Sequence, residues 1–267
     1  MTPFRIRQPD KDYSYPYSQS ENDKSNILIF GDSFSFGQGV RYKDIYSTKL
    51  QLLLAQNGYS RYKVTNVALN GSKHPRIVYN YYHALETQKN VKLVIYGFVI
   101  TAFGIGMEKK YIYNLVDQNN AGNKYNVWRK KIALYNLLVS SWEKYQVSQK
   151  VVKGYLNAFF DIDSNYKFKE ITYHAYNAHQ VGAKFVMLII PLMYQLNNKY
   201  PFYPIHHKIK DFCVKNNIAC IDSMDILSKY ETETLWASPT DHHPNEIAHN
   251  LIANELFKYL QKNGLLL

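Results

Sequence analysis

The stretch NILIFGDSFSFGQGV, residues 26–40, decides the fold class. Its first part is a short continuous apolar run, which is typical of a strand buried on both faces of a parallel sheet. Its second part has the glycines and short polar residues of a turn, and it brings Ser33 directly after the strand. The pattern therefore puts a serine hydroxyl at the carboxyl end of a buried strand, where open α/β sheets bind their ligands.

Similar apolar runs recur along the chain, and helical patterns lie next to them. Strands that alternate with helices predict parallel βαβ units with right-handed crossovers. We therefore expect an α/β fold with a central, mostly parallel sheet of about five strands. The expected strands are residues 26–30, 63–69, 91–100, 183–191 and 218–222, and the expected helices are residues 44–58, 75–88, 168–182, 206–216 and 244–263.

The domain organisation follows from the segments that break this alternation. Residues 1–25 are rich in Pro, Ser, Asp and Tyr without periodicity, which predicts an irregular lead-in over the surface. Residues 26–267 are expected to form a single domain. Within it, residues 104–163 have helical periodicity and no buried-strand run, which predicts a helical insertion after the third strand. The insertion is either a lid over the site or a separate packing layer.

Composition and charge exclude some classes of protein. Of the 267 residues, 46% are hydrophobic and 20% are charged, which is an ordinary balance for a globular domain. The formal net charge is +11, yet no run reaches the five or six like charges of a nucleic-acid-binding tail. We expect no nucleic-acid partner. A solvated lysine-rich surface is the simpler interpretation, and a basic face that attracts an acidic polymer or a membrane surface is the alternative.

Cysteines and terminal segments indicate little about the compartment. Only Cys213 and Cys220 are present, which excludes a disulfide framework or a CxxC metal site. The first thirty residues lack the pattern of a signal peptide, and no apolar run approaches the roughly 20 residues of a membrane span. We expect a soluble chain, cytoplasmic by default. Removal of an N-terminal signal or anchor from a precursor would instead allow an extracytoplasmic location, and the oligomeric state is not predicted.

Ser33 needs partners, because a serine hydroxyl is weakly nucleophilic until a base accepts its proton and a third group orients that base. His243 is the candidate base. Asp241 lies two positions before it, and residues two apart in extended backbone point the same way. Pro244 follows at once and is expected to begin a helix. Asp32 is expected to cap the turn beside the nucleophile.

The same C-terminal stretch, DHHPNEIAH, also contains His242 and His249. Three histidines and an aspartate offer a metal site as the alternative to a catalytic pair. No paired spacing on a helix supplies the remaining ligands, so we expect neither a metal nor a cofactor.

ILIFGDSFSFGQGV together with DHHPN resembles the SGNH hydrolases, also called the GDSL esterase and lipase superfamily. The first sequence motif of that family is Gly-Asp-Ser-(Leu or Phe), and its last motif is an Asp followed shortly by His. The resemblance covers about residues 26–263. It implies a three-layer α/β/α fold, and it implies a mechanism in which Ser33 attacks an ester carbonyl, His243 accepts the proton and Asp241 orients His243.

The resemblance also implies an oxyanion hole, with the backbone N–H groups of Ser33 and Gly71 as two of three donors. The family's third donor is an asparagine in a Gly-x-Asn-Asp motif after strand three. This chain reads Gly-Phe-Val-Ile there, and Val99 cannot donate from its side chain. Either Thr101 or Asn70 replaces the amide, or the hole has only backbone donors, or hydrolytic power is lost.

The last motif also departs from the commoner pattern. Asp241-x-His243 is one residue shorter than Asp-x-x-His, and the longer spacing would fall on Thr240, which carries no charge. The shorter form resembles family members related to polysaccharide acylation. The resemblance thus implies a serine esterase that cleaves a small acyl group, an acetyl group above all, from a carbohydrate or related small-molecule ester through an acyl-serine. The alternatives are an O-acyltransferase acting on a glycan and a catalytically degenerate binding protein.

Several aromatic and histidine residues have simpler interpretations. Tyr79–Tyr82 fits a helix face packed on the sheet. His74 either lines the pocket or caps the helix that begins near Pro75. His206 and His207 are expected to start a surface helix.

Overall fold

The computed structural model of the chain describes residues 5–10, 24–72, 74–100, 149–150, 152–157, 159–160, 164–197 and 199–266. The chain comprises two compact units, one of Met1–Val99 with Phe168–Leu267 and one of Ile100–Lys167. The described residues between 149 and 160 are helical, whereas residues 101–148 and 161–163, which hold most of the predicted insertion, lie outside the described part. The first unit holds the whole sheet.

The described strands confirm the predicted parallel sheet. Five strands lie in the order β2-β1-β3-β4-β5, and every neighbouring pair is parallel. The chain runs from β1 to β2 on one side and then crosses to β3 on the other side. The strand order therefore reverses between β1 and β3. Ligands bind outside the carboxyl ends of strands at such a point. The strands are β1 (Ser25–Gly31), β2 (Tyr62–Asn66), β3 (Val91–Phe98), β4 (Lys184–Ile189) and β5 (Ala219–Asp222).

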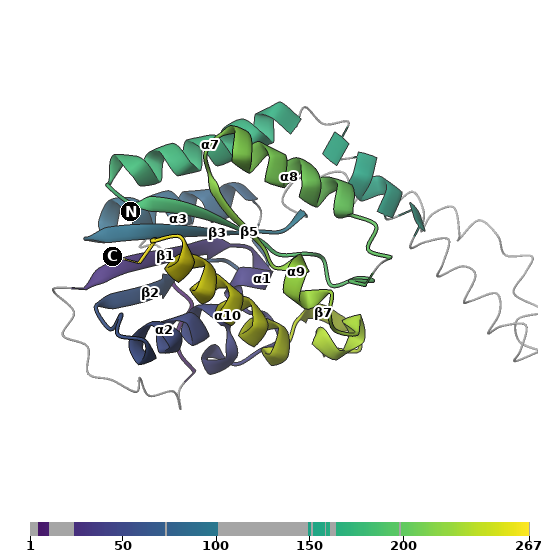
Figure 1. Cartoon of the computed structure of the whole chain (residues 1–267), viewed down its shortest axis with the longest axis horizontal. Coiled ribbons are helices and arrows are strands. Elements are labelled where there is room, and N and C mark those ends of the chain that lie inside the picture. The colour runs from purple at the N-terminus through teal and green to yellow at the C-terminus, as the bar shows by residue number, and fades with distance from the viewer. Residues whose placement is uncertain are drawn as a thin grey trace, which may run out of the picture. The chain divides into compact units, whose positions relative to one another are not determined.

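Helices cover both faces of the sheet, which confirms the three-layer α/β/α sandwich. The long helices α3, α7 and α8 cover one face, and α2 and α10 pack together on the other (Figure 1). Of the described helices, none is both long and apolar enough to cross a membrane. The long helices are α2 (Tyr46–Gln56), α3 (His74–Thr87), α7 (Ser164–Gln180), α8 (Tyr203–Lys215) and α10 (Glu246–Lys262), and the short elements are α1 (Ser33–Phe36), η1 (Tyr42–Asp44), α9 (Met224–Leu227), η3 (Thr232–Leu235), β6 (Trp236–Ser238) and β7 (Asp241–Pro244).

The core lies on both faces of the central strands, as the apolar runs predict. Ile27 to Phe30 of β1 are fully buried. The Phe30 ring stacks on Tyr81 at 4.0 Å and on Tyr96 at 4.4 Å between ring centroids. Tyr81 therefore packs α3 on the sheet as predicted. Tyr79, on the other side of the helix, is exposed, so the predicted packing holds for part of the tyrosine cluster only.

Pro244 corrects one sequence prediction. It ends the strand β7 and does not begin a helix. Asn245 is the N-cap of α10, because its side-chain oxygen accepts the N–H groups of Ile247 and Ala248. The side-chain oxygen of an asparagine cap accepts backbone N–H groups of the first helical turn, whereas a proline side chain has no hydrogen-bond acceptor. The helix therefore starts two residues later than expected, and β7 stays extended through His243.

The prediction that His206 starts a surface helix is wrong for its side chain. His206 lies in α8, but its side chain is buried and does not lie at the surface. Its Nδ1 pairs with the carboxylate of Asp222 at the end of β5, at 2.9 Å to Oδ2, and its Nε2 lies 3.1 Å from the hydroxyl of Tyr200. Two polar partners offset the cost of burying the imidazole. His207, one position on, is exposed as predicted.

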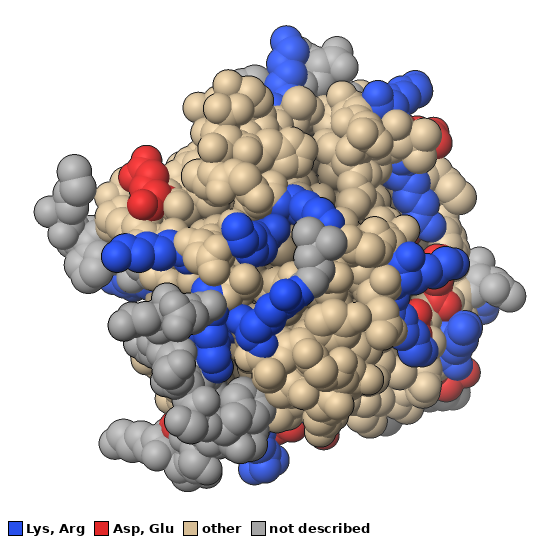
Figure 2. Space-filling model, turned by 60° about the vertical axis from the view of Figure 1, so that its left-hand side comes forward, with Lys and Arg blue, Asp and Glu red and all other residues tan. Residues whose placement is uncertain are grey.

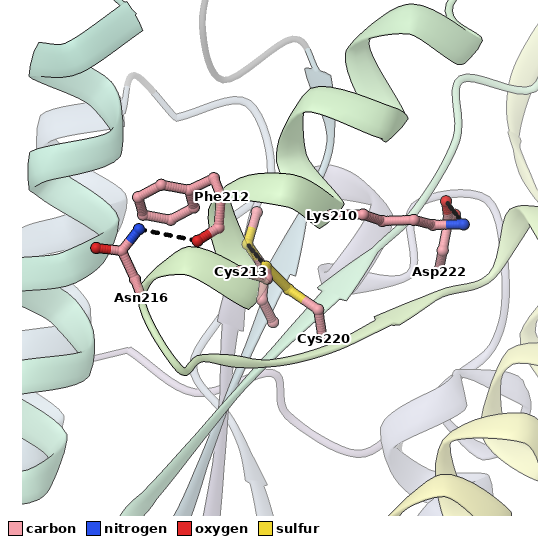
Figure 3. The surroundings of a disulfide bond; sticks show 7 residues. Lys210, Phe212, Cys213, Asn216, Cys220 and Asp222 are labelled. Carbon is pink, nitrogen blue, oxygen red and sulfur yellow. Dashed lines mark hydrogen bonds and ion pairs between the residues drawn. A yellow bond between two sulfur atoms is a disulfide. The ribbon is translucent and has the colours of Figure 1, made fainter.

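The two cysteines form one bridge, which the sequence analysis did not predict and which is no framework of several disulfides. Cys213 of α8 and Cys220 of β5 are joined, with their Cα atoms 6.2 Å apart (Figure 3). Seven positions separate them across the turn that leads from the helix to the strand. In the chain-entropy account a bridge closing so short a loop contributes about 2 kcal/mol. The bridge joins the same two elements that carry His206 and Asp222.

Charge that is scattered along the sequence converges in space. Lys63, Lys92 and Lys184 each lie within the first two residues of a strand, and parallel strands begin at the same edge of a sheet. Figure 2, which brings forward the left-hand side of Figure 1, shows a group of Lys and Arg side chains left of its centre, whereas acidic side chains lie among the basic ones on the right. Attraction of an acidic polymer or a membrane surface to this face stays a prediction.

Part of the N-terminal lead-in is held on the first unit. Residues 5–10 form neither helix nor strand. The backbone N–H of Arg5 donates to Asn80 at 2.7 Å, and that of Arg7 donates to the carbonyl of Asn66 at 2.8 Å. Asp10 accepts the N–H of Tyr42 at 2.7 Å. Residues 1–4 and 11–23 of the predicted lead-in lie outside the described residues.

Candidate active site

Ser33 begins a short helix directly after β1. The carboxylate of Asp32 is the N-cap and accepts the N–H of Phe34 at 3.0 Å, which agrees with its expected capping role. Gly37 ends the helix with φ of 81°, a left-handed conformation that glycine adopts without strain. The strand, the cap and the glycine together fix the turn, and Ser33 is left partly exposed at its start.

Two glycines allow this turn to lie close against the sheet. A Cβ atom on Gly97 of β3 would lie 1.8 Å from Ser35 Oγ, and one on Gly31 would lie 2.6 Å from the carbonyl oxygen of Gly97. Any side chain there would push α1 away. Ser35 is buried in this space and accepts a hydrogen bond of 2.9 Å from the hydroxyl of Tyr46. The close approach therefore positions the residues on either side of Ser35, including Ser33.

A hairpin near the C-terminus carries the other two candidates. Strands β6 and β7 are antiparallel and pair Ser238 with Asp241. The N–H of Asp241 donates to Ser238 Oγ at 3.0 Å. In the extended strand, Asp241 and His243 point the same way, and Asp241 Oδ1 bonds both His243 Nδ1 and the backbone N–H of His243, the latter at 3.1 Å. The carboxylate thereby fixes the plane of the imidazole.

The structure brings the three candidates together although 210 positions separate the serine from the histidine. His243 Nε2 lies 2.8 Å from Ser33 Oγ, within hydrogen-bond reach. The side chains of His243 and Asp241 are 20% and 33% exposed, so the group is open to solvent. Partial burial alone would raise the pKa of Asp241, but its hydrogen bonds from His243 and Gln38 hold that pKa below its usual value. Asp241 therefore stays charged near neutral pH.

Gln38 is a residue that sequence reasoning missed. Its side-chain Nε2 donates to Asp241 Oδ2 at 3.4 Å, so both oxygens of the carboxylate are engaged. Gly39 makes this approach possible, because a Cβ atom there would lie 2.6 Å from Ala237 Cβ. The signal was the pair of glycines on either side of Gln38, which bends the loop toward the hairpin. The two glycines thus act on the site through the geometry of the loop.

The predicted oxyanion donors are only partly described. Gly71 has φ of 60° and lies in the loop after β2, at the same sheet edge as Ser33, and its role as a donor stays a prediction. Asn70, beside it, is exposed. Val99 is buried, so its side chain packs in the core where the family has an amide. Thr101 lies outside the described residues.

The other histidines of the C-terminal stretch do not join the group. His249 is buried and accepts the N–H of Tyr46 on Nδ1 at 3.3 Å. Burial, together with the nearby Lys49 and His243, lowers the pKa of His249 to about 3, so the ring is neutral. His242 stacks on Trp236 with ring centroids 3.9 Å apart. In the described part of the chain, the grouping that suits a metal ion is a different one, His74 with Glu170 and His174.

Solved structures with the same fold were found by structural comparison. A protein named TesA is 15% identical with a TM-score of 0.52, covering 89% of this chain and 99% of its own. A variant of Axe2, an acetyl xylan esterase from Geobacillus stearothermophilus, is 13% identical with a TM-score of 0.52, covering 88% and 94%. A member of the lipolytic G-D-S-L family from Veillonella parvula is 14% identical with a TM-score of 0.51, covering 89% and 99%.

The sequence comparisons found no such likeness. No protein-family model matches the sequence, and no curated protein matches it. At identities this low, the structural likeness shows a shared fold. The chemistry has to be argued from the residues of the site.

Proposed function

We propose that this chain is a serine esterase in which Ser33 is the nucleophile, His243 the general base and Asp241 the group that orients His243. The observation that carries the proposal is the 2.8 Å approach of His243 Nε2 to Ser33 Oγ, with His243 Nδ1 bonded to Asp241. Nucleophile, base and orienting carboxylate in this order match the requirement for activating a serine.

In the proposed reaction, Ser33 Oγ attacks the carbonyl carbon of an ester while its proton passes to His243 Nε2. The tetrahedral intermediate carries a negative charge on the former carbonyl oxygen. When it collapses, the bond to the alcohol breaks and His243 gives its proton to the departing oxygen. Water then attacks the acyl-serine with His243 again as the base, which releases the acid and restores Ser33.

Asp241 supports both steps by holding His243 in one tautomer. An aspartate that bonds Nδ1–H leaves Nε2 as the acceptor that faces the serine. The lowered pKa of Asp241 keeps the carboxylate charged while His243 becomes an imidazolium. The backbone N–H groups of Ser33 and Gly71 would receive the negative charge of the intermediate. Because each such donor is worth about 10²- to 10³-fold in rate, the buried Val99 predicts a modest turnover.

We further propose that the substrate is a small acyl ester, an acetyl group above all, on a carbohydrate. The Axe2 protein of the same fold is an acetyl xylan esterase, and this is the support for the acyl group. The Cys213–Cys220 bridge suits an oxidising compartment, where disulfides persist and where glycans of a cell envelope would be met.

The proposal is tested by turnover of p-nitrophenyl acetate with the full chain. Ser33→Ala should lower kcat roughly 10⁴-fold or more, because no nucleophile remains. Ser60→Ala is the matched control, since Ser60 is an exposed serine outside the site, and it should keep wild-type turnover. Turnover that survives in Ser33→Ala would overturn the esterase proposal.

A glycan hydroxyl in place of water would turn the same acyl-serine into a transferase. The spacing Asp241-x-His243 supports this second reaction, because it resembles that of SGNH family members related to polysaccharide acylation. Incubation with an acetyl donor and candidate sugars measures the partition between free acetate and acetylated sugar. Acetylated sugar in excess of free acetate would assign transfer, and acetate alone would assign hydrolysis.

The buried Val99 favours one rival, a glycan-binding protein with a degenerate site. That rival predicts binding of an acetylated glycan without any turnover dependent on Ser33. Isothermal titration with the glycan, run beside the turnover assay, separates the two.

A further inference from the structure

A group of two histidines and a glutamate, none of them a residue of the proposed triad, joins α3 and α7. We call His74, Glu170 and His174 the α3–α7 cluster. His74 is the first residue of α3, and Glu170 and His174 lie one helical turn apart on α7, which puts them on the same face of that helix. One metal-binding atom from each residue lies within 4.8 Å of the other two.

The distances in the cluster suit an ion after a small adjustment. Zn²⁺ takes nitrogen and oxygen ligands at about 2.0 to 2.2 Å in tetrahedral geometry, so two of its ligand atoms lie roughly 3.4 Å apart. His74 Nε2 and Glu170 Oε1 are 2.7 Å apart, and the remaining separations are at most 4.8 Å. Rotation of partly exposed side chains covers a difference of that size. His74 and Glu170 are both partly exposed, which gives an ion a path from solvent.

His174 is held in place by its surroundings. It is 1% exposed, and the rings of Phe30, Tyr81 and Tyr96 lie around it at 5.5 to 5.8 Å between centroids. Its Nδ1 lies 2.7 Å from the hydroxyl of Tyr82. An outer hydrogen bond of this kind fixes the ring and the tautomer of a metal-binding histidine. In the tautomer whose Nδ1–H donates to the Tyr82 hydroxyl, His174 presents Nε2 to an ion.

We propose that the α3–α7 cluster binds one divalent transition-metal ion, with Zn²⁺ as the best match to two imidazoles and a carboxylate. Three protein ligands leave a fourth position for water. Bound ion would join the start of α3, three residues beyond Gly71, to α7. The inference does not rest on the proposed esterase, because none of its ligands belongs to the triad. The competing account is a simple ion pair between His74 and Glu170, which predicts no uptake of metal.

The test is metal binding by the full chain after treatment with EDTA. Titration calorimetry with ZnCl₂ should give one ion per chain. His74→Ala and Glu170→Gln should each weaken binding by 10-fold or more, and Tyr82→Phe by about 10- to 100-fold through the outer hydrogen bond. His179→Ala, an exposed histidine on the same helix, is the matched control and should bind like wild type. Zinc near 100 times its Kd should raise the Tm of wild type by about 5 °C and that of Glu170→Gln by much less.

CoCl₂ provides a reading on the unaltered chain, so the test stands even if a variant does not fold. The intense visible absorption of four- or five-coordinate Co²⁺ bound to nitrogen and oxygen ligands supports the site. Absence of zinc uptake, a cobalt spectrum like that of the hydrated ion, or equal affinity in wild type, His74→Ala and Glu170→Gln would overturn it.

Discussion

Two Asp–His pairs lie among the described residues, and each places its histidine between a carboxylate and a hydroxyl. His243 lies between Asp241 and Ser33, with Nε2 at 2.8 Å from the serine oxygen. His206 lies between Asp222 and Tyr200, at 2.9 Å and 3.1 Å. By connectivity alone, the two arrangements are nearly the same.

Their surroundings differ. The side chains of His243 and Asp241 are 20% and 33% exposed, whereas those of His206 and Asp222 are 2% and 3% exposed. Burial raises the pKa of Tyr200 well above its usual value, and its hydroxyl also accepts the N–H of Leu192 at 3.2 Å. The relay of hydrogen bonds is therefore insufficient for catalysis. A substrate must reach the hydroxyl, and of these two hydroxyl groups that of Tyr200 is buried whereas Ser33 is partly exposed.

The largest expected difference between the pairs is in turnover. Asp241→Asn should lower kcat for p-nitrophenyl acetate by roughly 10⁴-fold, because the amide favours the wrong tautomer of His243. Asp222→Asn should leave kcat per folded molecule within about twofold, since the buried pair touches no substrate. Circular dichroism establishes the folded fraction of each variant. Similar losses in both variants would remove the distinction between the pairs.

Stability should show the opposite order. Asp222→Asn should lower the free energy of unfolding by about 3 kcal/mol, because His206 and Lys210 lose a buried charged partner. Asp241→Asn should cost less than about 1 kcal/mol, because its carboxylate is partly exposed. Urea unfolding of the two variants and of wild type measures both values. A larger loss for Asp241→Asn would contradict the structural role given to the buried pair.

Acid should reduce the stability that the buried His206–Asp222 pair contributes, because the pKa of Asp222 is lowered in the fold. Burial alone would raise the pKa of Asp222, but the hydrogen bond from His206 and the positive charges of His206 and Lys210 hold this pKa below its ordinary 3.8. A carboxyl whose folded pKa is lowered stabilises the fold above its unfolded pKa, and this stability is lost as pH falls through the folded pKa. The Tm difference between wild type and Asp222→Asn should therefore be full at pH 6 and shrink below about pH 4. A constant difference down to pH 3 would refute this linkage.

The smallest expected effect concerns Gln38. Gln38→Ala removes the 3.4 Å bond to Asp241 Oδ2 and should lower kcat by only a few-fold, because His243 still bonds the other oxygen. Gln38→Glu is the variant to compare with it, because a second carboxylate repels that of Asp241 and should lower kcat further than Gln38→Ala does. Parallel kcat and KM measurements at pH 7 distinguish positioning from binding. No change in either variant would leave Gln38 without a role in the site.

The sheet and the helices were predictable because long buried runs and helical periods carry their own signal. The approach of Ser33 to His243 was foreseen from two motifs at the ends of one domain, although their contact joins residues 210 apart. Local spacing also explains Asp241 and His243, since residues two apart share a face of a strand.

Other features depend on tertiary packing and have no local signal. The burial of His206 follows from Asp222 and Tyr200, which no periodic pattern links to it. His74 and Glu170 are 96 positions apart and meet only because α3 and α7 cover the same face of the sheet. Pro244 was misjudged because its neighbour Asn245 makes the better cap.

The central claim, that Ser33 alone of these hydroxyls is activated, is tested most directly by a serine-directed phosphonate and mass mapping of the labelled peptides. The account predicts one adduct per chain, on Ser33, that disappears in Ser33→Ala and forms slowly in Asp241→Asn, with Tyr200 unlabelled. Absence of an adduct on Ser33, or labelling that persists in Ser33→Ala, would contradict it.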